Sequence, residues 1–133
     1  MSVFVDTSFF IALLDEDDEQ APAAAALWRQ ASAARRPVFT TDYVVLEACA
    51  VFQRRLGLAA VRRFVHQLLA PVDLEWVTRD DHERAVQALL VADRRRLSLV
   101  DCTSFEVMRR VEARDCLAFD QHFAQQGFAV VAG

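Results

Sequence analysis

Residues 1–15 read MSVFVDTSFFIALLD, and this stretch decides how the rest of the chain is interpreted. The short apolar run Val3-Phe4-Val5 predicts a strand, and Asp6 ends it. The segment from Ser8 to Leu14 then continues as an apolar helix. A strand that passes directly into a helix is the first half of a β-α-β unit, so the opening predicts a parallel sheet covered by helices.

The remainder of the chain repeats this alternation of short apolar runs and helical patterns. Further strands are predicted over Val38–Thr41, Leu74–Val77, Cys116–Phe119 and Phe128–Val131. Further helices are predicted over Ala21–Ala34, Tyr43–Leu56, Leu58–Leu69, Asp80–Ala92 and Leu99–Arg110, with a short one ending at Gln126. This order predicts an α/β fold with helices on both faces of the sheet. Because such sheets bind ligands at the carboxyl ends of their strands, functional residues should follow a strand or begin the next helix.

Length and composition restrict the kind of protein. A chain of 133 residues, 54% hydrophobic and 26% charged, fits one compact globular domain spanning residues 1–133. Its apolar runs are far shorter than the roughly 20 residues that a membrane helix needs, and the start lacks the basic region of a secretory signal. Cys49, Cys102 and Cys116 have apolar neighbours and no C-x-x-C spacing, which favours buried, reduced thiols. We expect a cytoplasmic protein that does not associate with a membrane.

Four of the nineteen acidic residues lie in apolar rather than polar segments. They are Asp6 in VFVD, Glu47 in VVLEACAVF, Asp101 in LSLVDCTSF and Asp120 directly after CLAF. A carboxylate is costly to desolvate, so each of these should have a partner, a proton or a metal ion. Asp6 and Asp120 each follow a predicted strand, where a parallel sheet binds ligands.

Helical spacing places the other two acids on inward faces. Glu47 shares its face with Val44 and Val51, so we expect it on the buried stripe of its helix. Asp101 shares a face with Ser104, Phe105 and Met108. Two strand-end acids and two inward-facing helical acids can therefore meet in one pocket.

Each acid except Glu47 has an ordinary structural alternative. Asp6 and Asp120 could cap the helices that follow them, and Asp101 could form a capping box with Ser98. A helix interior needs no inward carboxylate such as Glu47. All four acids nevertheless meet the same topological requirement, which favours a shared site.

Carboxylates without histidine or cysteine favour Mg²⁺, with Mn²⁺ as a substitute, over Zn²⁺. Such an ion would activate a water for attack on a phosphodiester. Thr7, Ser8 and Ser104 supply hydroxyls that could hold a metal-bound water or a phosphate oxygen, although capping or packing is the plainer role for each.

The charge balance needs explanation for a protein that acts on nucleic acid. Fifteen basic residues, all arginine, against nineteen acidic ones give a net charge of −4. Without the four proposed ligands the two signs balance, so bound cations would make RNA binding possible. Residues 94–96, all arginine, precede the helix of Asp101 and could approach an RNA backbone, although a solvated surface explains them equally well.

Missing residues exclude several rival activities of α/β domains. The chain has no lysine, which a phosphate-accepting receiver domain needs late in its sequence. The segment Asp6-Thr7-Ser8 is not the D-x-D of a haloacid-dehalogenase-type phosphatase, and there is no G-x-x-x-x-G-K phosphate loop.

The segments VFVDTSFFIALLD, LSLVDCTSFEVM and LAFDQHF, with an inward Glu between them, resemble the PIN-domain nucleases. The resemblance covers essentially the whole chain and is strongest to the VapC toxins of bacterial toxin–antitoxin pairs. It implies a PIN-like α/β/α sandwich with a five-stranded parallel sheet. It also implies an endoribonuclease dependent on Mg²⁺ or Mn²⁺ that acts on RNA, is inhibited by a cognate antitoxin protein and forms a homodimer.

The resemblance also assigns individual residues. Asp6, Glu47, Asp101 and Asp120 match the acids of the family's metal site, with Ser104 as the usual hydroxyl neighbour of Asp101. Some family members carry a further acid two residues after the last of these, where this chain has His122. We therefore expect one firmly held ion, with His122 a half-exposed helix residue that could contact phosphate. A catalytically inactive PIN-like binding module and a PIN nuclease of RNA processing that is not a toxin stay open as alternatives.

Overall fold

The computed structural model describes residues 2–131, so the two ends of the expected 1–133 domain lie outside it. It confirms the predicted α/β architecture, a wholly parallel sheet of five strands in the order β3-β2-β1-β4-β5. The strands are β1 (Val3–Val5), β2 (Val38–Thr41), β3 (Val72–Glu75), β4 (Asp115–Leu117) and β5 (Ala129–Val130).

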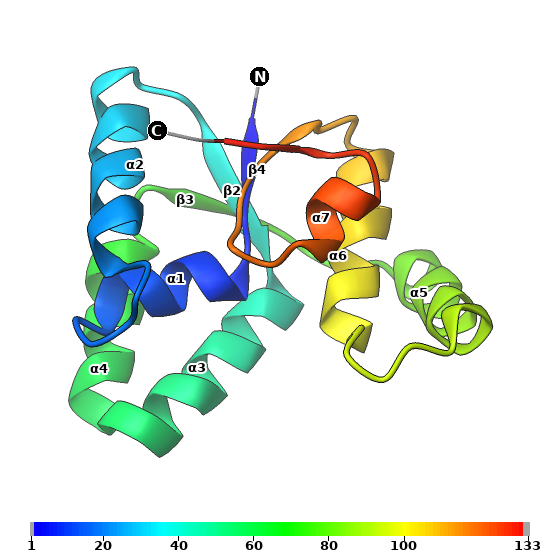
Figure 1. Cartoon of the computed structure of the whole chain (residues 1–133), viewed down its shortest axis with the longest axis horizontal. Helices are drawn as coiled ribbons and strands as arrows, with labels where there is room; N and C mark the ends of the chain where they lie inside the picture. Colours follow the sequence, from blue (N-terminus) through cyan, green and yellow to red (C-terminus); the bar gives the residue numbers. More distant parts are fainter. Residues whose placement is uncertain (1, 132–133) are drawn as a thin grey trace.

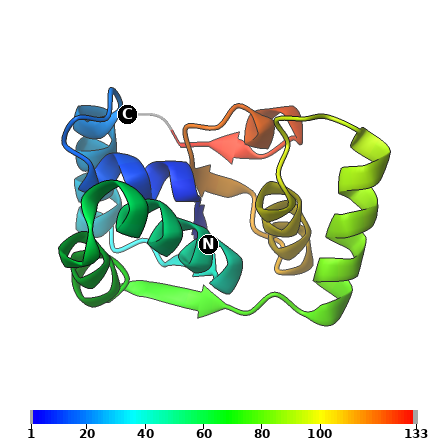
Figure 2. The same cartoon turned by 90° about the horizontal axis from the view of Figure 1, so that it is seen from below.

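Helices lie on both sides of this sheet (Figure 1), and the view from below separates α1 to α4 on one side from α5 to α7 on the other (Figure 2). Their bounds are α1 (Thr7–Leu14), α2 (Ala21–Ala33), α3 (Asp42–Leu56), α4 (Leu58–Arg63), α5 (Arg79–Ala92), α6 (Leu99–Arg110) and α7 (His122–Gln125). A π-helical turn, η1 (Phe64–Leu68), continues α4. The predicted helix over 58–69 is therefore an α-helix followed by a π-helical turn.

The strand order determines where a ligand can bind. From β1 the chain first adds β2 and β3 on one side, then returns past β1 to add β4 and β5 on the other. The direction of winding therefore changes between β1 and β4. A parallel sheet leaves a crevice at the carboxyl ends of two such strands, because the loops that follow them turn to opposite faces.

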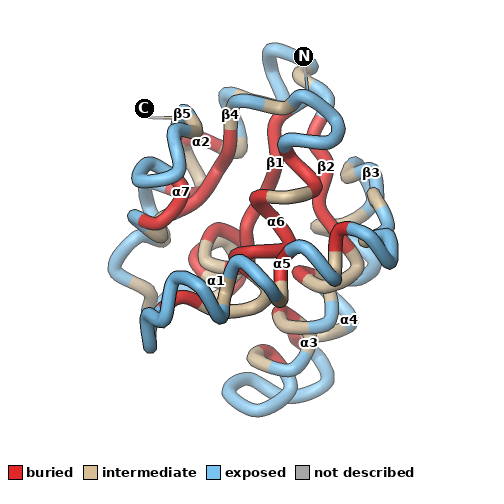
Figure 3. Tube along the Cα trace, turned by 90° about the vertical axis from the view of Figure 1, so that its right-hand side faces the viewer, coloured by how far each residue is buried: buried red, intermediate tan, exposed pale blue. Residues whose placement is uncertain are grey.

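Buried apolar residues hold the layers on the sheet. Val3, Phe4 and Val5 of β1 are at most 1% exposed, as expected for a central strand covered on both faces. Figure 3 shows this burial along β1, β2 and β4. The ring of Phe4 stacks on Phe123 of α7 and meets the edge of Phe39 of β2, so one aromatic cluster joins the sheet to α7.

Two predicted strands are displaced, for identifiable reasons. The strand expected over 74–77 runs over Val72–Glu75, because the N–H of Val77 donates to Asp42 Oδ1 (2.8 Å) instead of to a neighbouring strand. The strand expected over 116–119 ends at Leu117, because the N–H of Phe119 donates to Ser8 Oγ (3.0 Å). Asp120 therefore lies in a short loop three residues beyond β4.

Other expectations are met in part. Cys102 and Cys116 are buried and Cys49 is half-buried, all as free thiols. Within residues 2–131 no helix has both the length and the apolar character needed to span a lipid bilayer. Trp76, the residue after β3, is 65% exposed.

Arg110, at the end of α6, joins three elements. Its Nε donates to both carboxylate oxygens of Asp81 in α5 (3.1 Å each), Nη1 to Glu75 of β3 (3.0 Å) and Nη2 to the carbonyl of Trp76 (3.2 Å). Burial alone would raise the pKa of Asp81, but hydrogen bonds from Arg110 and Thr78 hold it below its ordinary value. The guanidinium thus fixes α5 and the end of β3 against α6.

Replacing Arg110 should destabilise the fold. Arg110→Ala leaves the buried Asp81 carboxylate without its cation, so we expect a loss of about 1–3 kcal/mol in the free energy of unfolding, measured by urea denaturation at pH 7. Arg79→Ala is the matched control, because within residues 2–131 the ion pair of Arg79 is an exposed one with Glu83, and its loss should cost about 0.5 kcal/mol or less. Equal losses in the two variants would contradict this account.

Candidate metal centre

Asp6 begins the site at the carboxyl end of β1. Its N–H donates to the carbonyl of Leu117 at the end of β4 (3.0 Å), which fixes the two strand ends side by side. Its Oδ2 accepts from the N–H (3.2 Å) and the hydroxyl (2.7 Å) of Ser8, so Asp6 is also the N-cap of α1. The predicted capping role is thus real, and it occupies one carboxylate oxygen of a side chain that is buried.

Ser8 connects this acid to the loop that carries Asp120. Its hydroxyl donates to Asp6 Oδ2 and accepts from the N–H of Phe119, the residue before Asp120. The same contact ends β4 and turns the chain. The loop over 118–120 is therefore held directly above the start of α1, which brings the two predicted strand-end acids to one place.

Asp101 reaches the site from the first turn of α6. Ser98 and Asp101 form a capping box in which Asp101 Oδ2 accepts from the Ser98 N–H (3.1 Å) and the Asp101 N–H donates to Ser98 Oγ (3.0 Å). The capping alternative is again realised, yet Asp101 is only 6% exposed and is aimed inward. Capping and burial in the site are compatible, because the cap uses one of its two oxygens.

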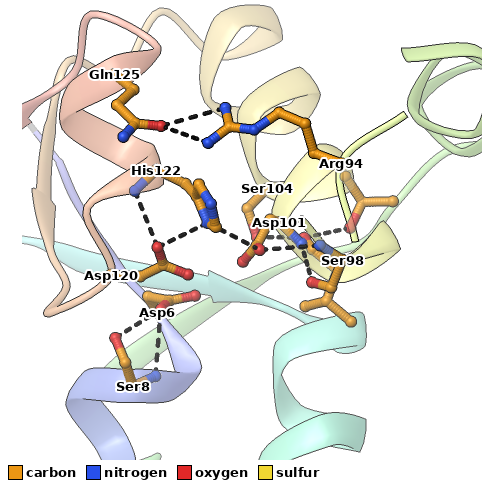
Figure 4. A network of polar contacts seen from close by, with 11 residues as sticks. Asp6, Ser8, Arg94, Ser98, Asp101, Ser104, Asp120, His122 and Gln125 are labelled. Carbon is orange, nitrogen blue, oxygen red and sulfur yellow. Dashed lines mark hydrogen bonds and ion pairs between the residues drawn. The ribbon is translucent and has the colours of Figure 1, made fainter. Parts of the chain in front are cut away.

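His122 completes the cluster, and the expectation that it is half-exposed is wrong. It is buried at the start of α7, with Nδ1 2.8 Å from Asp120 Oδ1 and 3.7 Å from Asp101 Oδ2 (Figure 4). Asp101, Asp120 and His122 each offer one ligand atom, and these three atoms lie within 4.8 Å of one another. The chain turns into α7 at this point, because Asp120 Oδ1 also accepts the N–H of His122 (2.9 Å).

The electrostatics of the site favour a cation. Burial and, to a smaller extent, the charge of Asp101 raise the pKa of Asp6 to about 7 against the opposing hydrogen bonds of Ser8. Burial also raises the pKa of Asp101, with the charge of Asp120 adding to the effect. Buried carboxylates that repel one another are stabilised either by protons or by a metal ion. Clustered carboxylates beside an imidazole therefore fit a divalent cation.

Two of the four predicted acids, Asp6 and Glu47, lie outside the group whose ligand atoms converge. Asp6 is close enough for the charge of Asp101 to raise its pKa. Val44 and Ala48 of α3 are buried, whereas Glu47 and Val51 are half-buried. The expected buried stripe therefore exists, but Glu47 lies at its margin. Among the described residues, the group whose ligand atoms converge comprises two aspartates and a histidine, without Glu47.

The three predicted hydroxyls have different surroundings. Ser8 binds Asp6 as described. Ser104 is buried and donates to the carbonyl of Val100 (2.8 Å), which is ordinary packing within α6. Thr7 Oγ1 is buried and has no hydrogen-bond partner among the described residues, so it keeps a free hydroxyl beside Asp6.

A basic residue lies at the rim of the site. Arg94, in the loop before α6, donates from both terminal nitrogens to Gln125 Oε1 of α7 (3.3 Å each). Figure 4 shows this pair on the His122 side of the cluster. The side chain is exposed, so its charge is accessible to an anionic ligand at the mouth of the site.

The sequence model of the PIN domain matches residues 3–129. The chain is 39% identical over 131 residues to a protein named 23S rRNA-specific endonuclease VapC20, from two strains of Mycobacterium tuberculosis, and the match covers 97% of both chains.

Solved structures are similar as well. A crystal structure of Mycobacterium tuberculosis VapC20, described as a sarcin-ricin loop cleaving toxin, superposes with a TM-score of 0.85 at 37% identity, covering 98% of this chain and 99% of that one. VapBC2 from Rickettsia felis, solved with a DNA fragment of its promoter, superposes with a TM-score of 0.74 at 7% identity over 98% of each chain, and this likeness shows the fold alone.

The raised pKa of Asp6 predicts how stability depends on pH when divalent metal is removed. The folded protein keeps a proton on Asp6 up to about pH 7, whereas the unfolded chain releases it near the ordinary value of 3.8. This contribution is therefore full below pH 3.8 and is lost as pH rises to about 7. Between pH 5 and 7.5, the free energy of unfolding of the wild type should fall about 2–3 kcal/mol more than that of Asp6→Asn.

Urea denaturation in a chelator at the two pH values measures this difference. Asp17→Asn, an exposed acid in the loop after α1, is the control and should retain the pH dependence of the wild type. If Asp6→Asn keeps it too, Asp6 is not the group responsible.

Proposed function

Because the chain belongs to the PIN-domain family and is homologous to a VapC-type endonuclease toxin, we propose that residues 1–133 form one metal-dependent PIN domain that cleaves 23S ribosomal RNA. The observation that carries the proposal is the convergence of Asp101, Asp120 and His122 beside Asp6, at the crevice between β1 and β4. Identity over nearly the whole length of a relative named for that RNA supports the choice of substrate.

In the proposed site, Asp6, Asp101 and Asp120 hold the ion, which we take to be Mg²⁺ or Mn²⁺. When bound, such an ion supplies a water of lowered pKa and screens the charge of the phosphodiester. Ser8 holds the carboxylate of Asp6 in place, and the Ser98 cap does the same for Asp101. Thr7, with its free buried hydroxyl, is proposed to bind a phosphate oxygen or a metal-bound water.

We also propose Glu47 and Ser104 as members of this site. Glu47 is retained through the resemblance to the metal-site acids of PIN nucleases, and it lies one turn into α3, which follows the carboxyl end of β2. Ser104 is proposed to support Asp101 from the next turn of α6. Arg94 is proposed to release Gln125 and bind an RNA phosphate at the rim.

Partners follow from the same family assignment. We propose that a cognate antitoxin protein inhibits the enzyme, that the chain forms a homodimer and that it acts in the cytoplasm.

Loss of an acid should abolish RNA cleavage without unfolding the protein. Asp6→Asn and Asp101→Asn keep an oxygen for their helix caps but remove the charge that binds the ion, so we expect at least a ~100-fold loss of cleavage. The assay is incubation of purified protein with ribosomes and Mg²⁺ or Mn²⁺, with cut sites in 23S RNA mapped by primer extension. Asp17→Asn is the control and should cleave as the wild type does.

The outcomes separate the alternatives. Wild-type protein that binds RNA but never cuts it would indicate an inactive binding module. Equal cleavage by wild type and both variants would show that these acids are not the active site. Cuts confined to RNA other than 23S would contradict the proposed substrate and leave the nuclease assignment standing.

Growth tests the toxin role separately from the nuclease activity. We expect induced expression of the wild type to arrest growth, whereas Asp101→Asn at the same level of folded protein should not. Co-expression of the protein encoded by the neighbouring gene should restore growth. That protein should also co-purify with the wild type and with Asp101→Asn. A folded, nuclease-active protein that leaves growth unchanged would favour a PIN nuclease of RNA processing.

A further inference from the structure

We propose that His122 Nδ1 is a protein ligand of the bound ion, beside Asp101 and Asp120, and that it makes this centre prefer Mn²⁺ to Mg²⁺. The inference rests on the proposed function, because it concerns the same ion. It adds a nitrogen ligand at the position where some family members carry a further acid.

The backbone fixes the direction of this imidazole. Asp120 Oδ1 accepts the N–H of His122 (2.9 Å), which closes a tight turn and points the side chain back at the same carboxylate. Phe123, the next residue, is fully buried and stacks on Phe4 of β1. The imidazole is therefore held between the end of β4 and the first turn of α6, with little freedom to rotate away.

The buried nitrogen lacks an ordinary partner. The His122 side chain is 9% exposed, and among the described residues Nδ1 makes no hydrogen bond of acceptable angle, although it lies 2.8 Å from Asp120 Oδ1. A buried polar atom without a hydrogen bond is costly and rare. An ion bound by the nitrogen and the neighbouring carboxylates would remove this cost, because the lone pair of Nδ1 would then face a positive charge.

The donor set decides which ion is preferred. Mg²⁺ is a hard ion that binds oxygen ligands and dehydrates reluctantly. Imidazole nitrogen is a softer donor that suits transition metals, and affinity for a mixed nitrogen and oxygen site rises from Mn²⁺ along the first row. One imidazole among carboxylates therefore disfavours Mg²⁺ while leaving enough oxygen for Mn²⁺.

The test uses the full-length, metal-stripped protein without RNA, so that it does not depend on catalysis. Mn²⁺ is titrated in and the free ion is followed by its electron paramagnetic resonance signal, while Mg²⁺ affinity is measured by competition. Pulsed resonance spectra then report whether a nitrogen is bound directly to Mn²⁺. We expect a directly bound nitrogen in the wild type and none in His122→Asn, with at least ~10-fold weaker Mn²⁺ binding.

A second variant and a control keep the test decisive. His122→Asp should bind Mn²⁺ without the nitrogen signal and should lower the ratio of Mn²⁺ to Mg²⁺ affinity at least ~10-fold relative to the wild type. His66→Asn alters an exposed histidine in η1 and should leave both affinities and the nitrogen signal unchanged.

Two results would overturn the proposal in different ways. Wild-type protein that binds Mn²⁺ tightly with no bound nitrogen would show that His122 lies beside the carboxylates without binding the ion. The proposed function would then stand. Wild-type protein that binds no Mn²⁺ at all would overturn both the ligand assignment and the proposed metal dependence.

Discussion

Mutual repulsion of buried carboxylates at the carboxyl ends of β1 and β4 is the constraint on which this structure depends. A parallel sheet is stable only when both faces are covered, and covering β1 also buries the acid that follows it. Asp6, Asp101 and Asp120 are held together by contacts that also build the fold: the cap of α1, the cap of α6 and the turn into α7. The protein therefore cannot separate these charges without losing helix starts.

Much of this arrangement was predictable from the sequence, because it depends on local patterns. The run Val3-Phe4-Val5 and the S-x-x-D signature at Ser98 are complete within a few residues, and both β1 and the start of α6 lie where the patterns place them. The parallel order of the strands follows from the alternation of strands and helices, and with it the edge at which the acids gather.

The features of the fold and the site that local patterns do not predict depend on contacts between residues distant in the sequence. The end of β4 is set by the Ser8 hydroxyl, 111 residues from Phe119, which no local pattern contains. The burial of His122 depends on the approach of α6 to the loop after β4, so the segment LAFDQHF alone predicts a half-exposed helix residue at this position. For Glu47, helical spacing predicts the face of α3 on which it lies, but not how near that face comes to the other acids.

The double use of Asp101 as helix cap and buried acid has a consequence for how such a protein can change over generations. Asparagine caps a helix as well as aspartate does, and a single nucleotide transition converts one codon to the other. A population carrying this gene is therefore one step from a folded copy without the charge at residue 101. If the proposed antitoxin binds the folded surface, the inactive variant would bind the antitoxin too. The intact enzyme would then no longer be inhibited. The geometry that makes the acid structural thus also makes a dominant interfering allele easy to reach.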